Sequence, residues 1–121
     1  MIRSFAGFAA GALVVFGLSA MGLLTALGAH PRWTYTVPLL GLVPAAVLYA
    51  IGLRYTVPGL ILSLVLLIAC LVAARIGASL FINSYAENTL AGRFWYFGWI
   101  GAAGADTAFL GLLFQRVFDR R

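Results

Sequence analysis

The stretch from Phe94 to Phe118 limits the possible folds of this chain more than any other part of the sequence. Its residues are mainly aromatic, aliphatic or small, and it exceeds the roughly 20 apolar residues that cross the hydrocarbon core of a bilayer. One carboxylate, Asp106, lies near its middle. An ionisable residue at that depth is costly in lipid and usually faces protein or water. The stretch therefore predicts a membrane helix with at least one protected face.

The rest of the chain has the same apolar character. Of its 121 residues, 64% are hydrophobic and only 9% are charged, whereas about 25% are charged in an average soluble domain. This amount of polar surface cannot cover a globule in water. The bilayer must therefore be the solvent for most of the chain. We expect one domain, residues 1–121, of the all-α membrane class: a bundle of four transmembrane helices joined by short loops.

Four apolar runs define the expected helices, and segments with proline, arginine or asparagine separate them. The helices are predicted at approximately residues 5–29, 35–53, 58–82 and 94–116. The first run is longer than the about 7–15 apolar residues of a secretory signal peptide, so we expect it to remain as a helix.

The distribution of arginine predicts the orientation. Four spans place both termini and the second loop on one side of the membrane. That side carries most of the arginines: Arg3, Arg54, Arg116, Arg120 and Arg121. Because an excess of basic residues marks the cytoplasmic side, we expect both termini in the cytoplasm. The absence of lysine beside abundant arginine, alanine and glycine suggests a bacterial chain, and hence an inner (cytoplasmic) membrane.

Small residues in the first run predict close helix packing. Gly7 and Gly11 form a GxxxG pair, which allows another backbone to approach closely. On a continuous helix over residues 5–29, the same face would also hold Ser4, Gly22, Thr25 and Ala29. The pair serves either as a contact between two copies or as packing inside one bundle, and the frequency of this motif in membrane helices favours the second interpretation.

The last run has its own stripe of small residues. Its members are Gly101, Gly104, Ala108 and Gly111, and helical periodicity puts them opposite the face that holds Asp106. A small-residue face and an acidic face are both unsuited to lipid, so this helix is expected to contact protein on two sides. A bundle of only four helices can hardly cover both sides of this helix, so we expect a homo-oligomer or a larger membrane-protein partner.

Few residues could carry chemistry. The chain has one histidine, one cysteine and three acidic residues, which is too few for a metal site, a disulfide or a placed acid–base pair. We therefore expect no catalytic residues, no cofactor and no metal, and an enzyme is not predicted. The arginines are scattered singly between apolar runs, so a nucleic-acid partner is not predicted either.

Asp106 and Arg75 remain as candidates for an ion or proton site. Counted from Ile82 and Phe94 at roughly 1.5 Å per residue, their depths differ by about 8 Å, so an ion pair between them is plausible. The function that we expect is that of an accessory or structural subunit of a membrane complex, acting through helix packing. The alternative is a small proton-coupled transporter or ion channel that works as a homo-oligomer through Asp106.

Overall fold

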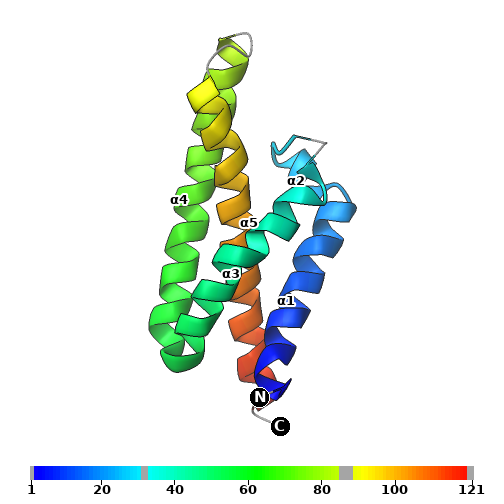
Figure 1. Cartoon of the computed structure of the whole chain (residues 1–121), viewed down its shortest axis with the longest axis vertical. Helices are drawn as coiled ribbons and strands as arrows, with labels where there is room; N and C mark the ends of the chain where they lie inside the picture. Colours follow the sequence, from blue (N-terminus) through cyan, green and yellow to red (C-terminus); the bar gives the residue numbers. More distant parts are fainter. Residues whose placement is uncertain (1, 31–32, 85–88, 120–121) are drawn as a thin grey trace.

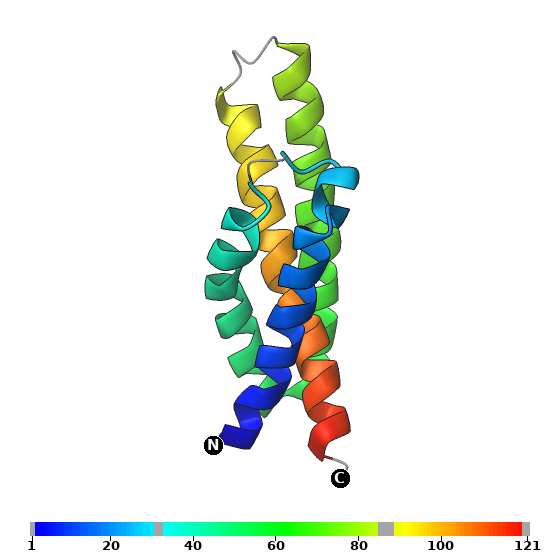
Figure 2. The ribbon, with the colours of Figure 1, turned by 90° about the vertical axis from the view of Figure 1, so that its right-hand side faces the viewer.

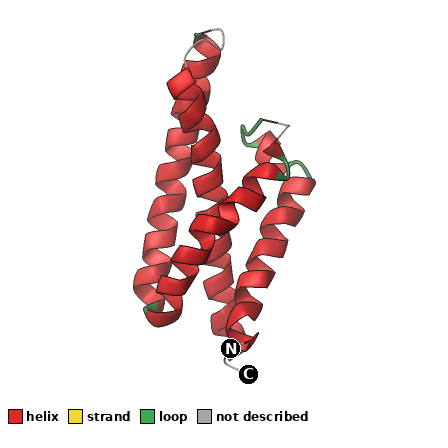
Figure 3. Ribbon diagram, viewed as in Figure 1, coloured by secondary structure: helices red, strands yellow, loops and turns green. Residues whose placement is uncertain are grey.

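The computed structural model describes residues 2–30, 33–84 and 89–119, with side chains from residue 5 onward. Helices make up almost all of these residues, and the described ranges contain no strand (Figure 3). The four long helices are α1 (Ile2–Ala20), α3 (Thr36–Arg54), α4 (Thr56–Asn83) and α5 (Thr89–Asp119). A short helix, α2 (Leu23–Ala26), lies in the connection between α1 and α3. The all-α class is therefore confirmed.

The long helices alternate in direction, and the two chain ends lie at the same end of the bundle (Figure 1). We call this the terminal end, and we call the opposite end, which holds the connection through α2, the α2 end. Helix α5 is the centre of the arrangement, because α1, α3 and α4 all pack against it. The view in Figure 2 shows α4 and α5 continuing beyond the level at which α1 stops.

Three helices of the described chain are long and apolar enough to cross a membrane: α3, α4 and α5. The apolar part of α1 whose side chains are described, Phe5–Ala20, is shorter. Large aliphatic side chains are exposed over much of the bundle, and those of α4 include Ile61, Val65, Ile68 and Val72. A surface of this kind is suited to lipid or to another apolar protein rather than to water.

The prediction of one continuous helix over residues 5–29 is wrong. Helix α1 ends at Ala20, and Gly22 has φ 89°, which interrupts the right-handed helix before α2 begins. Gly28, with φ 121°, turns the chain again after α2. Glycine adopts positive φ without a Cβ clash, so these two residues break an apolar run that hydrophobicity alone would continue. The face predicted to join Gly7 with Gly22 therefore does not exist.

The other helix bounds differ from prediction mainly at the start of α5. Helices α3 and α4 agree with the predicted ranges to within two residues at each end. Helix α5 begins at Thr89, five residues before the predicted start, because residues 89–93, expected in the loop, continue the helix. A packing contact supports this first turn: a Cβ on Gly77 would lie 2.6 Å from the carbonyl oxygen of Ala91.

Candidate functional site

The predicted small residues of α5 lie against the helices that surround it. A Cβ on Gly101 would lie 2.6 Å from Sγ of Cys70 in α4, and one on Gly104 would lie 2.6 Å from the carbonyl oxygen of Gly41 in α3. Ala108 is fully buried in a cluster with Leu48 of α3. Approaches this close exclude larger side chains and bring backbones into contact, which is how helices gain packing energy inside a bilayer.

Gly7 and Gly11 in α1 face the same central helix. A Cβ on Gly7 would lie 2.6 Å from Cβ of Gln115, and one on Gly11 would lie 2.6 Å from the carbonyl oxygen of Thr107. Gly111 of α5 is close to both positions. The GxxxG pair therefore lies inside the bundle in this structure, where it brings the backbone of α1 onto α5.

Asp106 is half-buried on a stripe of α5 that lies between the contacts of this helix with α4 and with α1. The residue before it, Ala105, is buried in a cluster that Leu67 of α4 packs against, and the residue after it, Thr107, contacts Gly11 of α1. Because successive residues of a helix are about 100° apart, Asp106 falls between α1 and α4.

The same stripe continues toward the terminal end. Asp106 and Leu110 are half-buried and Leu113 is 38% exposed, at spacings that align them on one face. We call these three residues the open strip. In the part of the chain that the structure describes, the carboxylate of Asp106 has neither a hydrogen bond nor an ion pair.

Arg75 does not pair with Asp106 among the described residues, and the register of α4 against α5 explains why. Gly98 lies opposite Ala74, and Gly101 lies opposite Cys70. Arg75 is therefore level with about residue 97 of α5, nine residues or about 14 Å from the level of Asp106. The expected offset was about 8 Å; the difference arises because α5 begins earlier than predicted.

Gln115 is a buried polar residue that the sequence reasoning missed. Its Oε1 accepts hydrogen bonds from the backbone N–H of Gly7 at 2.9 Å and from the hydroxyl of Tyr49 at 3.2 Å. Its Nε2 donates to Oδ1 of Asp119 at 2.8 Å. One side chain thus links α1, α3 and α5 at the terminal end. A signal was available, because Gln115 continues the small-residue stripe at a spacing of four from Gly111.

Aromatic side chains link the segments at the α2 end. The ring centroids of Trp33 and Trp95 are 4.9 Å apart, and those of Trp33 and Tyr96 are also 4.9 Å apart. Nε1 of Trp95 donates a hydrogen bond to the carbonyl oxygen of Gly28 at 2.9 Å. This bond and these ring contacts attach the connection between α1 and α3 to α5.

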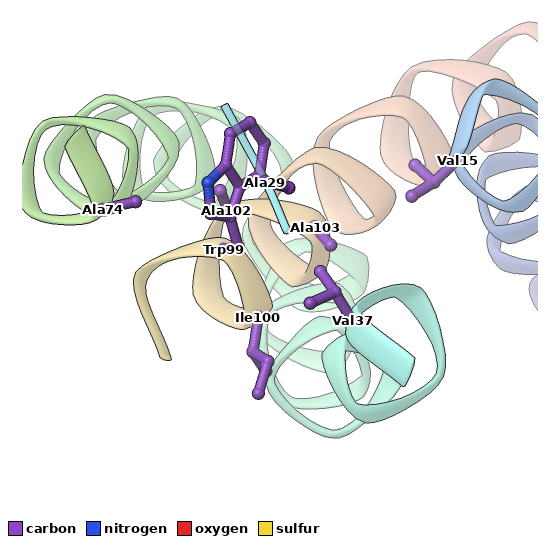
Figure 4. Close-up of a cluster of buried hydrophobic side chains, with 8 residues drawn as sticks. All are labelled: Val15, Ala29, Val37, Ala74, Trp99, Ile100, Ala102 and Ala103. Carbon is purple, nitrogen blue, oxygen red and sulfur yellow. The ribbon is translucent and has the colours of Figure 1, made fainter. Parts of the chain in front are cut away.

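A buried apolar cluster lies just beneath the aromatic contacts. Figure 4 shows Ala29, Ala74 and Trp99 from three separate segments gathered in it. Val15 near the end of α1 and Val37 at the start of α3 belong to the same cluster. The cluster therefore marks the level at which α1 stops and α3 begins.

Two grooves open around these aromatic residues. The first, which we call the Arg75 groove, has a volume of about 490 Å³. It is lined by Leu27, Gly28, Leu71, Ala74, Arg75, Ala78, Ser79, Ile82, Trp95 and Trp99. The second has a volume of about 570 Å³ and is lined by His30, Trp33, Phe81, Thr89, Gly92, Arg93, Trp95 and Tyr96. Trp95 separates the two grooves, and an arginine lies in each.

The described residues contain no group of three or more histidine, cysteine or acidic side chains that could hold a metal ion. Glu87 lies outside the described residues.

The chain matches no known family model, no curated protein and no solved structure. Because the levels of Arg75 and Asp106 are about 14 Å apart along α5, Asp106 on the open strip and Arg75 in its groove are two separate candidate sites rather than one.

Proposed function

We propose that this chain is an accessory or structural subunit of a membrane complex, and that the open strip receives a helix of its partner. In this proposal four helices span a bacterial inner membrane and both termini are cytoplasmic. The alternating directions of the long helices and the excess of arginine in the terminal segments and in the loop between α3 and α4 support this orientation.

The observation that carries the proposal is the half-buried carboxylate of Asp106 between α1 and α4. A carboxylate facing lipid at this depth is costly. A helix from another chain that lies against Leu110 and Leu113 would remove the open strip from lipid, and a hydrogen-bond donor on that helix would satisfy Asp106. The small residues of α5 are already used inside the bundle, so the partner contact depends on this polar interaction rather than on a glycine stripe.

A different protein fits the open strip better than a second copy does. Two copies related by an axis along the membrane normal would bring Asp106 against Asp106 at the same depth, and like charges repel strongly in a low-dielectric medium. A partner helix with an arginine, a lysine or a polar amide at that depth would supply a donor instead. The proposed partner is therefore a membrane protein with an intramembrane hydrogen-bond donor.

Photo-crosslinking in native membranes tests this proposal. A photoreactive residue at position 113, which is 38% exposed on the open strip, should give one discrete crosslinked product. The same residue at position 65, which is 56% exposed on α4, should give none, because that face contacts lipid. In Asp106→Leu the product at position 113 should disappear, whereas the amide of Asp106→Asn can still hydrogen-bond and should retain part of it. Absence of any product at position 113 in the unchanged chain would refute the proposal.

The transport alternative depends on the same carboxylate but requires it to titrate. In vesicles containing the purified chain and a pH-sensitive dye, a transporter or channel should carry protons with the unchanged sequence and lose this flux in Asp106→Asn. Flux that depends on Asp106, together with no crosslink at position 113, would favour the alternative over the accessory function.

A further inference from the structure

The Arg75 groove combines apolar walls with a small polar patch. Its walls include Leu27 from the connection after α2, Leu71 from α4, and Trp95 and Trp99 from α5. Arg75 and Ser79 also line it, and both are exposed on α4 at a spacing of four residues, which puts them on the same face. Such a surface suits a ligand with an apolar chain and a charged head.

The level of Arg75 in the bundle matches the edge of a bilayer. Its neighbour Ala74 belongs to the buried cluster that contains Val15 and Val37, at the level where α1 stops and α3 begins. Helices α1 and α3 have 19 residues each, or about 28 Å, which is close to the ~30 Å thickness of the hydrocarbon core. A bilayer that spans α1 and α3 would therefore put residue 75 at the edge of its hydrocarbon core, close to the level of the lipid phosphates, with Leu71 and Trp99 of the groove on the hydrocarbon side.

The charge of this region favours an anion. Arg75 and Arg93 lie in grooves on either side of Trp95. The carboxylates of the described residues are Asp106, about 14 Å deeper, and Asp119, at the terminal end. Neither neutralises Arg75, and no described residue forms an ion pair with it.

We propose that the Arg75 groove is a binding site for an anionic phospholipid. The phosphate of the headgroup accepts hydrogen bonds from the Arg75 guanidinium and the Ser79 hydroxyl, a charge-assisted contact that arginine makes well. One acyl chain lies along Leu71 and Trp99 toward the centre of the bilayer. The apolar walls select a lipid over a free phosphate, and the positive charge selects an anionic lipid over a zwitterionic one. This inference is independent of the proposed protein partner.

Quenching of tryptophan fluorescence by brominated lipids tests the site directly. The chain has three tryptophans, all at the α2 end, and two of them line the groove. In vesicles of phosphatidylcholine, a small fraction of phosphatidylglycerol with brominated acyl chains should quench this fluorescence at about tenfold lower mole fraction than brominated phosphatidylcholine does, the preference expected of one charge-assisted contact. Equal quenching by the two lipids would overturn the proposal.

Variants assign the preference to one arginine. In Arg75→Gln the preference for the anionic lipid should fall to near one, and in Arg75→Lys it should be partly retained. Arg116→Gln is the matched control, since Arg116 is exposed at the terminal end, and it should leave the preference unchanged. If Arg93→Gln abolishes the preference and Arg75→Gln does not, the headgroup binds in the neighbouring groove and the assignment is wrong.

A competition experiment separates the lipid from a free anion. Glycerol phosphate added to the same vesicles, at a fixed ionic strength, should not reverse the quenching by the anionic lipid, because it lacks the chain that fills the apolar part of the groove. Full reversal would show that the site recognises a free phosphate, and it would overturn the proposal of a lipid site. The far-ultraviolet circular dichroism of each variant in detergent confirms that the helices remain folded.

Discussion

The two helical hairpins of this bundle differ in length and in how they are held. Helices α1 and α3 have 19 residues each, whereas α4 has 28 and α5 has 31. At about 1.5 Å per residue, the first hairpin is close to the thickness of a hydrocarbon core and the second exceeds it by at least 12 Å. The first hairpin therefore has about the length of a hydrocarbon core, and the second extends beyond the first at the α2 end (Figure 2).

The two ends of the bundle are stabilised by different chemistry. At the terminal end, α1 lies directly on the backbone of α5, and the Gln115 side chain links three helices. At the α2 end, Trp95 and Tyr96 of α5 contact Trp33 in the connection between α1 and α3, and Phe81 of α4 contacts Trp95 in turn. Backbone packing of glycine tolerates almost no added volume, whereas ring contacts on a surface adapt more easily. We therefore expect substitutions at the terminal end to cost more.

The largest effect is expected for Gly7→Ala. The added methyl would lie 2.6 Å from Cβ of Gln115 and would also meet the backbone of Gly111, so α1 must move away from α5. Overpacking of this kind typically costs about 1–3 kcal/mol, and we expect the upper part of that range because the obstacle is backbone. Unfolding of the purified protein in detergent, followed by tryptophan fluorescence, measures the loss.

Gly17→Ala is the matched control for this prediction. Gly17 lies in the same helix, but a Cβ there would have no atom within 4 Å. The variant should be neutral, or more stable by up to about 1 kcal/mol, since alanine is the better helix former. Equal losses for the two variants would show that α1 is not held by its contact with α5.

A smaller effect, about 2 kcal/mol, is expected for Gln115→Leu. Leucine has a similar volume but cannot accept hydrogen bonds from the Gly7 N–H and the Tyr49 hydroxyl, or donate to Asp119. Loss of a buried partner typically costs about 1–3 kcal/mol. The control is Arg116→Leu at the exposed next position, which should change the free energy of unfolding by less than about 0.5 kcal/mol. If Gln115→Leu is equally mild, the polar link does not stabilise the terminal end.

The smallest effect is expected at the α2 end, for Trp95→Phe. Phenylalanine keeps a ring in the aromatic contacts but removes the hydrogen bond to the Gly28 carbonyl. A loss of about 1 kcal/mol should increase amide hydrogen exchange in residues 23–29 about fivefold, with little change elsewhere.

Tyr96→Phe keeps all the rings and retains the Trp95 bond, so exchange in the same segment should remain as in the unchanged chain. Faster exchange throughout α5 in Trp95→Phe would contradict the expected difference between the two ends of the bundle, because it would mean that the α2 end controls the stability of the whole bundle.

The features of the fold that follow from hydrophobicity and helical periodicity could be predicted from the sequence. The all-α class, the bounds of α3 and α4, and the presence of close-packing small residues in α5 all follow from apolar runs and residue spacing. The end of α1 did not follow, because Gly22 and Gly28 fall inside a long apolar run, and only their positive φ values mark the break. Glycine is common in membrane helices and serves there in close packing, so composition alone does not distinguish a packing glycine from one that ends the helix.

The candidate site was predicted in part. Asp106 stood out as an isolated charge in an apolar run, but its distance from Arg75 depends on where α5 begins, and residues 89–93 at that start were predicted to belong to a loop. Gln115 was missed because a single glutamine near the end of an apolar run looks like an interfacial residue. Its role depends on meeting Gly7, which lies 108 positions away in the sequence. Contacts over such separations follow from the packing of whole helices rather than from any local pattern.

The central position of α5 has a consequence for the order in which the bundle can assemble. The other three long helices precede α5 in the chain, and each depends on it for most of its packing. In the membrane topology that we propose, the helices enter the bilayer individually before they associate, so α1, α3 and α4 lack their contacts with α5 until α5 arrives. During that interval their glycine faces are open to other membrane helices. Synthesis thus exposes, for a short time, surfaces that the finished bundle hides.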